Sequence, residues 1–213
     1  MKILDIRNKV ARHPTKKLSY RKLTDIRKIV VHHSLTRRGL GGANAEAYFR
    51  YHVFTNGWSI GGYSYVIEPD GTIKWCADWN IITPHVGNHN KHCIGICLTG
   101  DFRVEDPTNV QYEALLWLIK YLQKELPNKC DVVGHSELPG YEWKPCPVIS
   151  MNKVRSDLKG VSFEMQPWQR QAAYDAIEEL DKKGLLPYHG KPEYWKEKVR
   201  NGTLEQELNW LAP

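Results

Sequence analysis

Several common features of protein sequences are absent from this chain, and each absence narrows its class. No apolar run is long enough to span a bilayer, and Met1–Arg7 carry charges where a secretory signal needs an apolar core. The five cysteines are an odd number without a Cys-x-x-Cys pair, so a disulfide framework is not expected. Repeats and low-complexity segments are also missing. The 213 residues therefore predict one sizeable globular domain, alone or with a small appendage, that is made and kept in a cytosol.

The positive charge is unevenly distributed along the chain. The formal net charge is +6, yet residues 161–213 carry seven Lys and Arg against nine Asp and Glu, so residues 1–160 hold the excess. A basic body favours an anionic partner such as nucleic acid, a membrane surface or an anionic cell-wall polymer, although a merely soluble surface explains it equally well. Because there is no dense basic run and no nucleic-acid-binding motif, nucleic acid is not the partner we expect.

The hydrophobic pattern predicts an α/β fold, with a mixed central β-sheet and helices packed on it. Short apolar or β-branched runs bounded by polar residues predict strands, and these runs are residues 26–33, 63–67, 72–76, 93–98 and 131–134. The run 93–98 is apolar on both faces, so we expect it inside the sheet. Pro69-Asp70-Gly71 predicts the turn of a hairpin between 63–67 and 72–76.

Two amphipathic helices are predicted beside these strands. Asn44 is expected to cap a helix over residues 45–54. A longer helix begins at Thr108, buries a leucine-rich face and stops before Pro127. Residues 1–22 are basic and mixed, and we expect them to form an irregular lead-in.

Residues 160–213 predict a small α-helical C-terminal appendage. Helical spacing there indicates one helix from Trp168 to Leu180 ended by Gly184, and shorter ones over 192–200 and 204–211. The tail is rich in Trp and Tyr, which suit stacking on sugars but at helical spacing are more often core residues. Cell-wall targeting and simple packing both remain open for this segment.

The strongest chemical signal is Gly134-His135-Ser136-Glu137 followed by Lys144-Pro145-Cys146-Pro147. This histidine and cysteine offer a nitrogen and a thiolate, the ligands that zinc prefers, and a catalytic zinc takes three protein ligands with one open position. A third ligand must therefore come from elsewhere. His32 and His33 end a predicted strand, and only one of them can enter a given site because strand side chains alternate. Periodicity does not say which.

Five motifs follow one another in an order that resembles a known family. They are Ile29-Val30-Val31-His32-His33-Ser34, Gly62-Tyr63-Ser64-Tyr65-Val66-Ile67-Glu68-Pro69-Asp70-Gly71, Ile94-Gly95-Ile96, Gly134-His135-Ser136-Glu137 and Lys144-Pro145-Cys146-Pro147. Together they resemble the zinc N-acetylmuramoyl-L-alanine amidases of the amidase-2 type, which include phage lysins and peptidoglycan recognition proteins. The resemblance covers about residues 25–158, which implies a zinc amidase domain in residues 1–159 and a separate module in 160–213.

The resemblance implies one zinc ion held by His32, His135 and Cys146. His33 then becomes a core or supporting residue. Recycling amidases of the same superfamily carry an aspartate where this chain has Cys146 and a glutamate where it has Cys97, so the resemblance is to the lysin-like branch.

The resemblance also implies the catalytic residues. Lys144 matches the catalytic lysine of the phage type, and Tyr63 matches its catalytic tyrosine. The lysine ammonium can stabilise a developing oxyanion or protonate the departing amine. The tyrosine, whose reference pKa is about 10, is a better orienting group than a base. His85 in Pro84-His85-Val86-Gly87 resembles the substrate-groove histidine of the family.

The expected function is hydrolysis of the amide between N-acetylmuramic acid and L-alanine in bacterial peptidoglycan. The expected location follows that of a phage lysin, which stays in the host cytoplasm and acts on the wall after release. Anionic wall polymers are further expected partners, through the basic body or the tail. Two other classes remain as alternatives: a non-catalytic peptidoglycan-binding receptor module, and a nucleic-acid-binding protein with a structural zinc.

Overall fold

The computed structural model describes residues 3–159, 167–185 and 192–200. The chain divides into two compact units, Met1–Leu158 and Lys159–Pro213. No helix among the described residues is long and apolar enough to cross a membrane.

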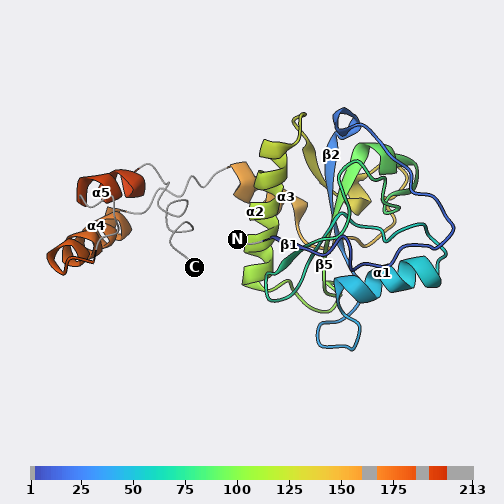
Figure 1. Ribbon diagram of the computed structural model, residues 1–213, viewed down its shortest axis with the longest axis horizontal. Helices are drawn as coiled ribbons and strands as arrows, with labels where there is room; N and C mark the ends of the chain where they lie inside the picture. Colours follow the sequence, from blue (N-terminus) through green and yellow to red (C-terminus); the bar gives the residue numbers. More distant parts are fainter. Residues whose placement is uncertain (1–2, 160–166, 186–191, 201–213) are drawn as a thin grey trace. The chain divides into compact units, whose positions relative to one another are not determined.

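The first unit is built on a six-stranded sheet, which confirms the expected mixed sheet with helices packed on it (Figure 1). Its strands are β1 (Ile3–Asp5), β2 (Lys28–His33), β3 (Tyr65–Ile67), β4 (Ile73–Trp75), β5 (Cys93–Leu98) and β6 (Asp131–Gly134), in the spatial order β1-β4-β3-β5-β2-β6. Strands β3 and β4 pair antiparallel as the expected hairpin, whereas the pairs β1–β4, β3–β5, β2–β5 and β2–β6 are parallel. Strand β5 lies inside the sheet and is buried at every position, as its apolar sequence predicts.

The prediction that residues 1–22 are irregular throughout is wrong for one short segment. Ile3–Asp5 form strand β1, which pairs in parallel with Ile73–Trp75 at the edge of the sheet. A strand of three residues with little buried surface has too short a pattern to stand out in the sequence. Its partner β4, distant in the sequence, supplies the hydrogen bonds that make it a strand.

The two predicted helices are α1 (Ala45–Phe54) and α2 (Asn109–Glu125), and a third, α3 (Met151–Lys159), follows the last strand. The Asn44 side chain accepts a hydrogen bond from the Ala47 N–H, and the Thr108 hydroxyl accepts one from the Gln111 N–H, so both predicted caps are formed. Short 3-10 turns complete the unit at Leu23–Asp25, Gly87–His92 and His135–Glu137.

The helices bury two different faces of the sheet. The core on one face contains Ile29 and Val31 of β2 with residues of α2 and α3. The core on the other face joins Cys97 and Val66 to residues of α1. Since side chains alternate along β2, His32 lies on the α1 face, and His33 lies on the α2 face, where its ring stacks on Phe102.

The second unit contains helices α4 (Pro167–Lys182) and α5 (Pro192–Arg200), two of the three expected in the tail. The third, over 204–211, lies outside the described residues. Ile177 of α4 packs against Trp195 and Val199 of α5, and Trp195 is only 4% exposed. The Trp195 ring is therefore used in packing rather than presented to solvent.

Candidate metal centre

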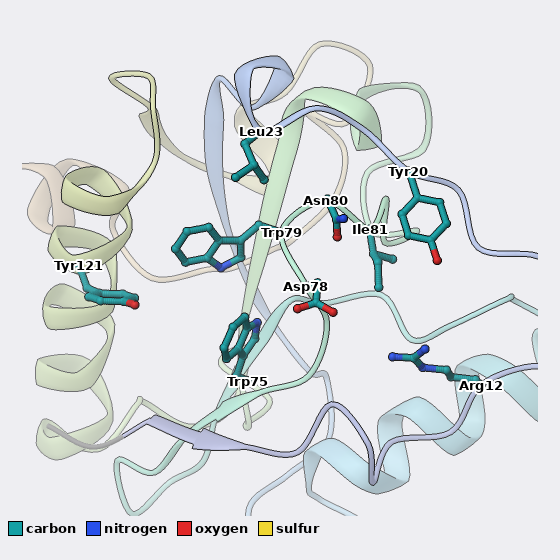
Figure 2. Close-up of a pocket in the computed structure, with 9 residues that line it drawn as sticks. All are labelled: Arg12, Tyr20, Leu23, Trp75, Asp78, Trp79, Asn80, Ile81 and Tyr121. Atoms are coloured by element: carbon teal, nitrogen blue, oxygen red, sulfur yellow. The ribbon is translucent and has the colours of Figure 1, made fainter.

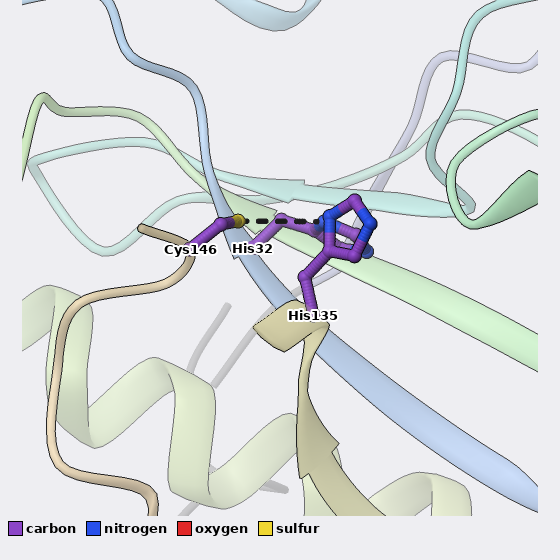
Figure 3. A group of neighbouring side chains, drawn as sticks. All are labelled: His32, His135 and Cys146. Carbon is purple, nitrogen blue, oxygen red and sulfur yellow. Dashed lines mark hydrogen bonds between the residues drawn. The ribbon is translucent and has the colours of Figure 1, made fainter. Parts of the chain in front are cut away.

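His32, His135 and Cys146 come together from three segments of the first unit (Figure 3). Their ligand atoms all lie within 4.8 Å of one another. The register of the sheet explains the meeting of the two histidines. Val31 of β2 is the partner of Gly134 at the end of β6, so the next residue along each strand emerges at the same edge. The ring centroids of His32 and His135 are consequently 4.7 Å apart.

The loop that carries Cys146 is held from both sides. The Ser136 N–H donates to the Cys146 carbonyl at 2.9 Å, and the His33 Nε2–H donates to the Pro145 carbonyl at 2.9 Å. Gly134 also permits the close approach of the loop, because a Cβ there would stand 2.7 Å from a ring carbon of Pro147. The Cys146 Sγ thus lies 3.7 Å from the Nδ1 of His32.

His33 itself is buried, and both of its ring nitrogens are engaged. Its Nδ1 accepts from the Phe102 N–H at 3.0 Å, so the proton resides on Nε2 and points to Pro145. Burial lowers the pKa of His33, which favours this neutral form. The residue acts as a clamp between the sheet and the Cys146 loop.

Replacement of His33 by alanine is expected to destabilise the first unit. His33→Ala leaves the buried Phe102 N–H and the Pro145 carbonyl without partners, at a cost of about 3 kcal/mol in the free energy of unfolding. Urea denaturation measures this loss. The control is His92→Ala, which removes an exposed histidine that bonds one carbonyl, that of Asp25. Equal stabilities of the two variants would contradict the clamp.

His85 lies behind His32 rather than on an open surface. It is 9% exposed, and its Nδ1 is 2.9 Å from the Nε2 of His32. Its own Nε2 lies 3.4 Å from the Cys93 carbonyl. The His32 Nε2–H can therefore donate to the His85 Nδ1 while the His85 Nε2–H donates to that carbonyl. Gly95 makes the room, because a Cβ there would be 2.8 Å from the His85 Nδ1. The substrate-groove role expected for His85 stays a prediction. Its contact with His32 was not expected from the sequence.

The three candidate ligands are uncharged at neutral pH when no cation is present. Burial lowers the pKa of His32 far below its ordinary value and that of His135 to about 4, with the nearby Lys144 charge adding to both effects. Burial raises the pKa of the Cys146 thiol to about 11. Two neutral imidazoles offer free lone pairs, and a bound cation would shift the thiol towards the thiolate that ligates metals.

The donor set fits a metal ion. The Nε2 of His135 is buried and has no hydrogen-bond partner, and a buried polar atom of this kind ordinarily has one. Because ligand atoms of His32 and Cys146 lie within 4.8 Å of it, a cation bound by all three residues would satisfy this nitrogen. The His-His-Cys group could therefore bind a metal.

Tyr63 and Lys144 lie beside the group. The rings of Tyr63 and His32 have centroids 5.2 Å apart, and Tyr63 lines a cavity of about 370 Å³ together with Ser34, Tyr48 and His52. Burial raises the pKa of the Tyr63 hydroxyl well above its usual value, so it stays protonated and able to donate. The Lys144 Nζ lies 5.8 Å from the centroid of Tyr141, whose ring neighbours that of His135.

Glu137 has structural partners. It accepts from the Gly134 N–H at 2.8 Å and forms two hydrogen bonds with the Arg155 guanidinium of α3, at 2.8 and 2.9 Å. This pairing lowers the pKa of Glu137. The Glu137 carboxylate thereby fixes the turn that carries His135. It does so by binding the backbone of the turn and not the His135 ring.

Comparison with known proteins points to one family. A family model described as N-acetylmuramoyl-L-alanine amidase matches residues 22–148. The endolysin of Klebsiella phage KP32 is 26% identical over 142 residues, which cover 64% of this chain and 90% of the endolysin. The solved structure of the endolysin N-acetylmuramoyl-L-alanine amidase LysCS from Clostridium intestinale shares 25% identity at a TM-score of 0.61, covering 74% of this chain and 95% of that one.

Some relatives are much longer than this chain. The N-acetylmuramoyl-L-alanine amidase of Sus scrofa is 29% identical over 93 residues, which are 41% of this chain but only 16% of the porcine protein. The match thus concerns only a small part of that protein. All five motifs noted in the sequence begin within the matched residues 22–148.

Proposed function

Because the chain belongs to the N-acetylmuramoyl-L-alanine amidase family of the amidase-2 type, we propose that it hydrolyses the amide between N-acetylmuramic acid and L-alanine in bacterial peptidoglycan. One observation carries the proposal. His32, His135 and Cys146 form a metal-competent group directly beside Tyr63 and Lys144. These are the five positions at which the resemblance in the sequence implies the metal ligands and the catalytic residues.

Zinc is the proposed ion, since two imidazole nitrogens and a thiolate suit it and leave one position open. When bound, zinc polarises a carbonyl and lowers the pKa of water towards neutrality, which supplies an electrophile and a nucleophile for an unreactive amide. The protein contributes two neutral imidazoles at the edge of the sheet and an ionisable thiol on a loop, and two hydrogen bonds hold the Cys146 loop in place.

Lys144 is the proposed source of positive charge for the reaction. The tetrahedral species formed when water attacks an amide carries negative charge on the former carbonyl oxygen, and an ammonium group stabilises that charge. The same group can deliver a proton to the departing alanine nitrogen. Its backbone is held close to Cys146, because the Cys146 N–H donates to the Lys144 carbonyl at 2.8 Å.

Tyr63 is proposed to orient the water or the carbonyl as a hydrogen-bond donor. The raised pKa of its buried hydroxyl argues against a role as base, since the phenolate is scarce at neutral pH. The adjoining 370 Å³ cavity is the proposed place for the muramoyl end of the substrate.

His85 is expected to tune metal affinity. Second-sphere partners of ligating histidines fix the ring and its protonation, and their removal weakens binding about 10–100-fold. His85→Ala should raise the dissociation constant for zinc by that factor in competition with a chromophoric chelator. His89→Ala is the control, because His89 lies in the same loop and bonds Pro139 instead. An unchanged zinc affinity in His85→Ala would show that His85 does not support His32 as a ligand.

A receptor module that binds peptidoglycan without cleaving it is the alternative. Tyr63, Lys144 and Cys146 favour the enzyme, because binding alone needs neither a proton donor nor an activated water. The KP32 relative is an endolysin, so we further propose that this protein acts on the cell wall after release from the cell that makes it.

Product analysis tests the proposed bond. Amide hydrolysis releases one alanine α-amino group and one lactyl carboxyl group per cleavage and no reducing sugar end. Purified cell walls treated with the protein should gain amino-terminal alanine without gaining reducing ends. New reducing ends with no new alanine amino groups would assign a glycosidase instead. No product of either kind, together with retained wall binding, would favour the receptor.

A further inference from the structure

A second cavity lies away from the metal-competent group. Its volume is about 480 Å³, and it is lined by Arg12, Tyr20, Leu23, Trp75, Asp78, Trp79, Asn80, Ile81 and Tyr121. Figure 2 shows the rings of Trp75, Trp79 and Tyr121 gathered on one side and Arg12, Tyr20 and Ile81 on the other. We call it the aromatic pocket. Its volume is in the range of small-molecule sites.

The three rings of the aromatic pocket pack with the core on the α2 side of the sheet, whereas Ile81 at its other side belongs to the core that contains α1 residues. Trp75 is the register partner of Tyr65, and both rings pack with the core that contains α2. His32 is the register partner of Cys97, which lies in the core on the α1 side. The pocket also shares no lining residue with the cavity beside Tyr63, so it is not an extension of the proposed catalytic cleft.

The aromatic rings are rigidly held, and their N–H groups are already used. The Trp79 Nε1–H donates to the Tyr65 hydroxyl at 2.8 Å, and the Trp75 Nε1–H donates to the Ala77 carbonyl at 2.8 Å. Tyr121 stacks on Trp117 of the same helix with an interplanar angle of 1°. The Arg7 guanidinium already covers one face of Trp75, 3.6 Å from its ring centroid, so Trp79 and Tyr121 supply most of the apolar surface left for a ligand. Because these rings are fixed, binding to them costs little ordering.

The polar side chains around the rings have unused hydrogen-bonding capacity. Among the described residues, the side chains of Arg12, Tyr20 and Asn80 have no hydrogen-bond partner. Asp78 pairs one carboxylate oxygen with Arg7 and leaves the other unbonded. Tyr20 is 62% exposed. Flat apolar surface bordered by planar donors and acceptors matches a sugar ring, which has apolar C–H faces and hydroxyl or acetamido groups at its edge.

The charge of the aromatic pocket selects among wall polymers. Its lining has one basic and one acidic side chain, Arg12 and Asp78, and Asp78 pairs with Arg7, which in turn pairs with Asp5. These two basic and two acidic side chains balance, so the pocket has no net charge of its own to attract a polyanion. We propose that the aromatic pocket is a second carbohydrate site that binds neutral N-acetylated hexose units of a glycan strand. The choice of glycan rests on the proposed function, because a wall hydrolase acts on a polymer that carries such units.

A second site would hold the enzyme on its insoluble substrate. Binding a glycan at the aromatic pocket raises the effective concentration of neighbouring muramoyl amides at the cleft without altering the cleft. The site would thus increase affinity for intact walls more than the rate on small soluble fragments.

The test uses the β-1,4-linked tetramer of N-acetylglucosamine, which contains no amide that the proposed reaction cleaves. Calorimetric titration of the full-length protein should show binding, and both Tyr20→Ala and Trp79→Ala should weaken it about tenfold, the effect expected from one lost hydrogen bond or one lost ring contact, respectively. Phe54→Ala is the matched control, since Phe54 is 63% exposed and lies on α1, outside the pocket. Tyr20→Ala keeps the test valid if loss of the Trp79 ring impairs folding.

The proposal would be overturned by no binding of the tetramer, by equal binding of wild type and both pocket variants, or by weakening in Phe54→Ala as large as in Tyr20→Ala. Tighter binding of a polyanionic teichoic acid than of the tetramer would also overturn it. The amino-group assay on walls is read separately, so a failed carbohydrate site and a failed amidase are distinguishable. Binding of the tetramer without release of alanine amino groups would support the carbohydrate site and contradict the amidase activity.

Discussion

Chelation and Cys146→Ser are each expected to abolish cell-wall lysis, with a loss of about 10³-fold or more. Polarisation of the carbonyl and activation of water each contribute several kcal/mol to such reactions, and both require the ion. Serine is a poor zinc ligand at neutral pH, so the variant should also lose metal. Zymography on purified walls, with and without chelator, measures the activity, and metal analysis of the same samples measures the zinc.

Cys130→Ser is the matched control for this experiment. Cys130 is also buried, at 2% exposed, but its thiol packs in the core around α2 and hydrogen-bonds the backbone carbonyls of Ile26 and Asn128. It should retain metal and lysis. Readdition of zinc should restore the chelated wild type but not Cys146→Ser. Undiminished lysis after either treatment would remove zinc from the mechanism.

Lys144→Met is expected to lower kcat about 10²–10³-fold while metal content and wall binding stay at wild-type levels. Loss of one group that stabilises a developing oxyanion has this magnitude, and methionine keeps much of the apolar stem. Because the charge acts on the transition state, kcat should fall more than KM rises. The measurement is release of alanine amino groups from a soluble muramoyl peptide at several concentrations.

Lys153→Met separates a specific effect from a general loss of charge. The Lys153 Nζ also lies over a tyrosine ring, 5.0 Å from the centroid of Tyr112, and pairs with Asp157 on α3. That variant should keep full activity. Wild-type kcat in Lys144→Met would take the lysine out of the reaction and favour a role in binding. The outcome bears directly on the choice between enzyme and receptor.

Local pattern was enough to predict most elements of the sheet. The predicted run 93–98 is strand β5 with the same bounds, and the helix predicted over 45–54 is α1 with the same cap. Such elements are predictable because burial on one or both faces imposes a period that the residues themselves carry. Strand β1 was not predicted because three residues are too few to show a hydrophobic period, and its pairing depends on β4.

The supporting contacts of the site could not be read from the sequence. His33 and His85 stand beside recognisable motifs, but the clamp on Pro145 and the contact with His32 join residues 112 and 53 positions apart. Gly95 of strand β5 has no side chain, and this leaves the small space that His85 occupies. Nothing in the local sequence around either histidine encodes these partners.

By itself the sequence determined the donor atoms, the strands that carry them and the family that the order of motifs resembles. Those properties are local, because ligand chemistry belongs to single residues and strand formation to short runs. Tertiary structure alone decided that Val31 pairs with Gly134, which brings His32 and His135 to one edge of the sheet. It alone also assembled the aromatic pocket from Trp75, Trp79 and Tyr121. Both depend on the register and packing of segments far apart in the chain, which a local pattern does not specify.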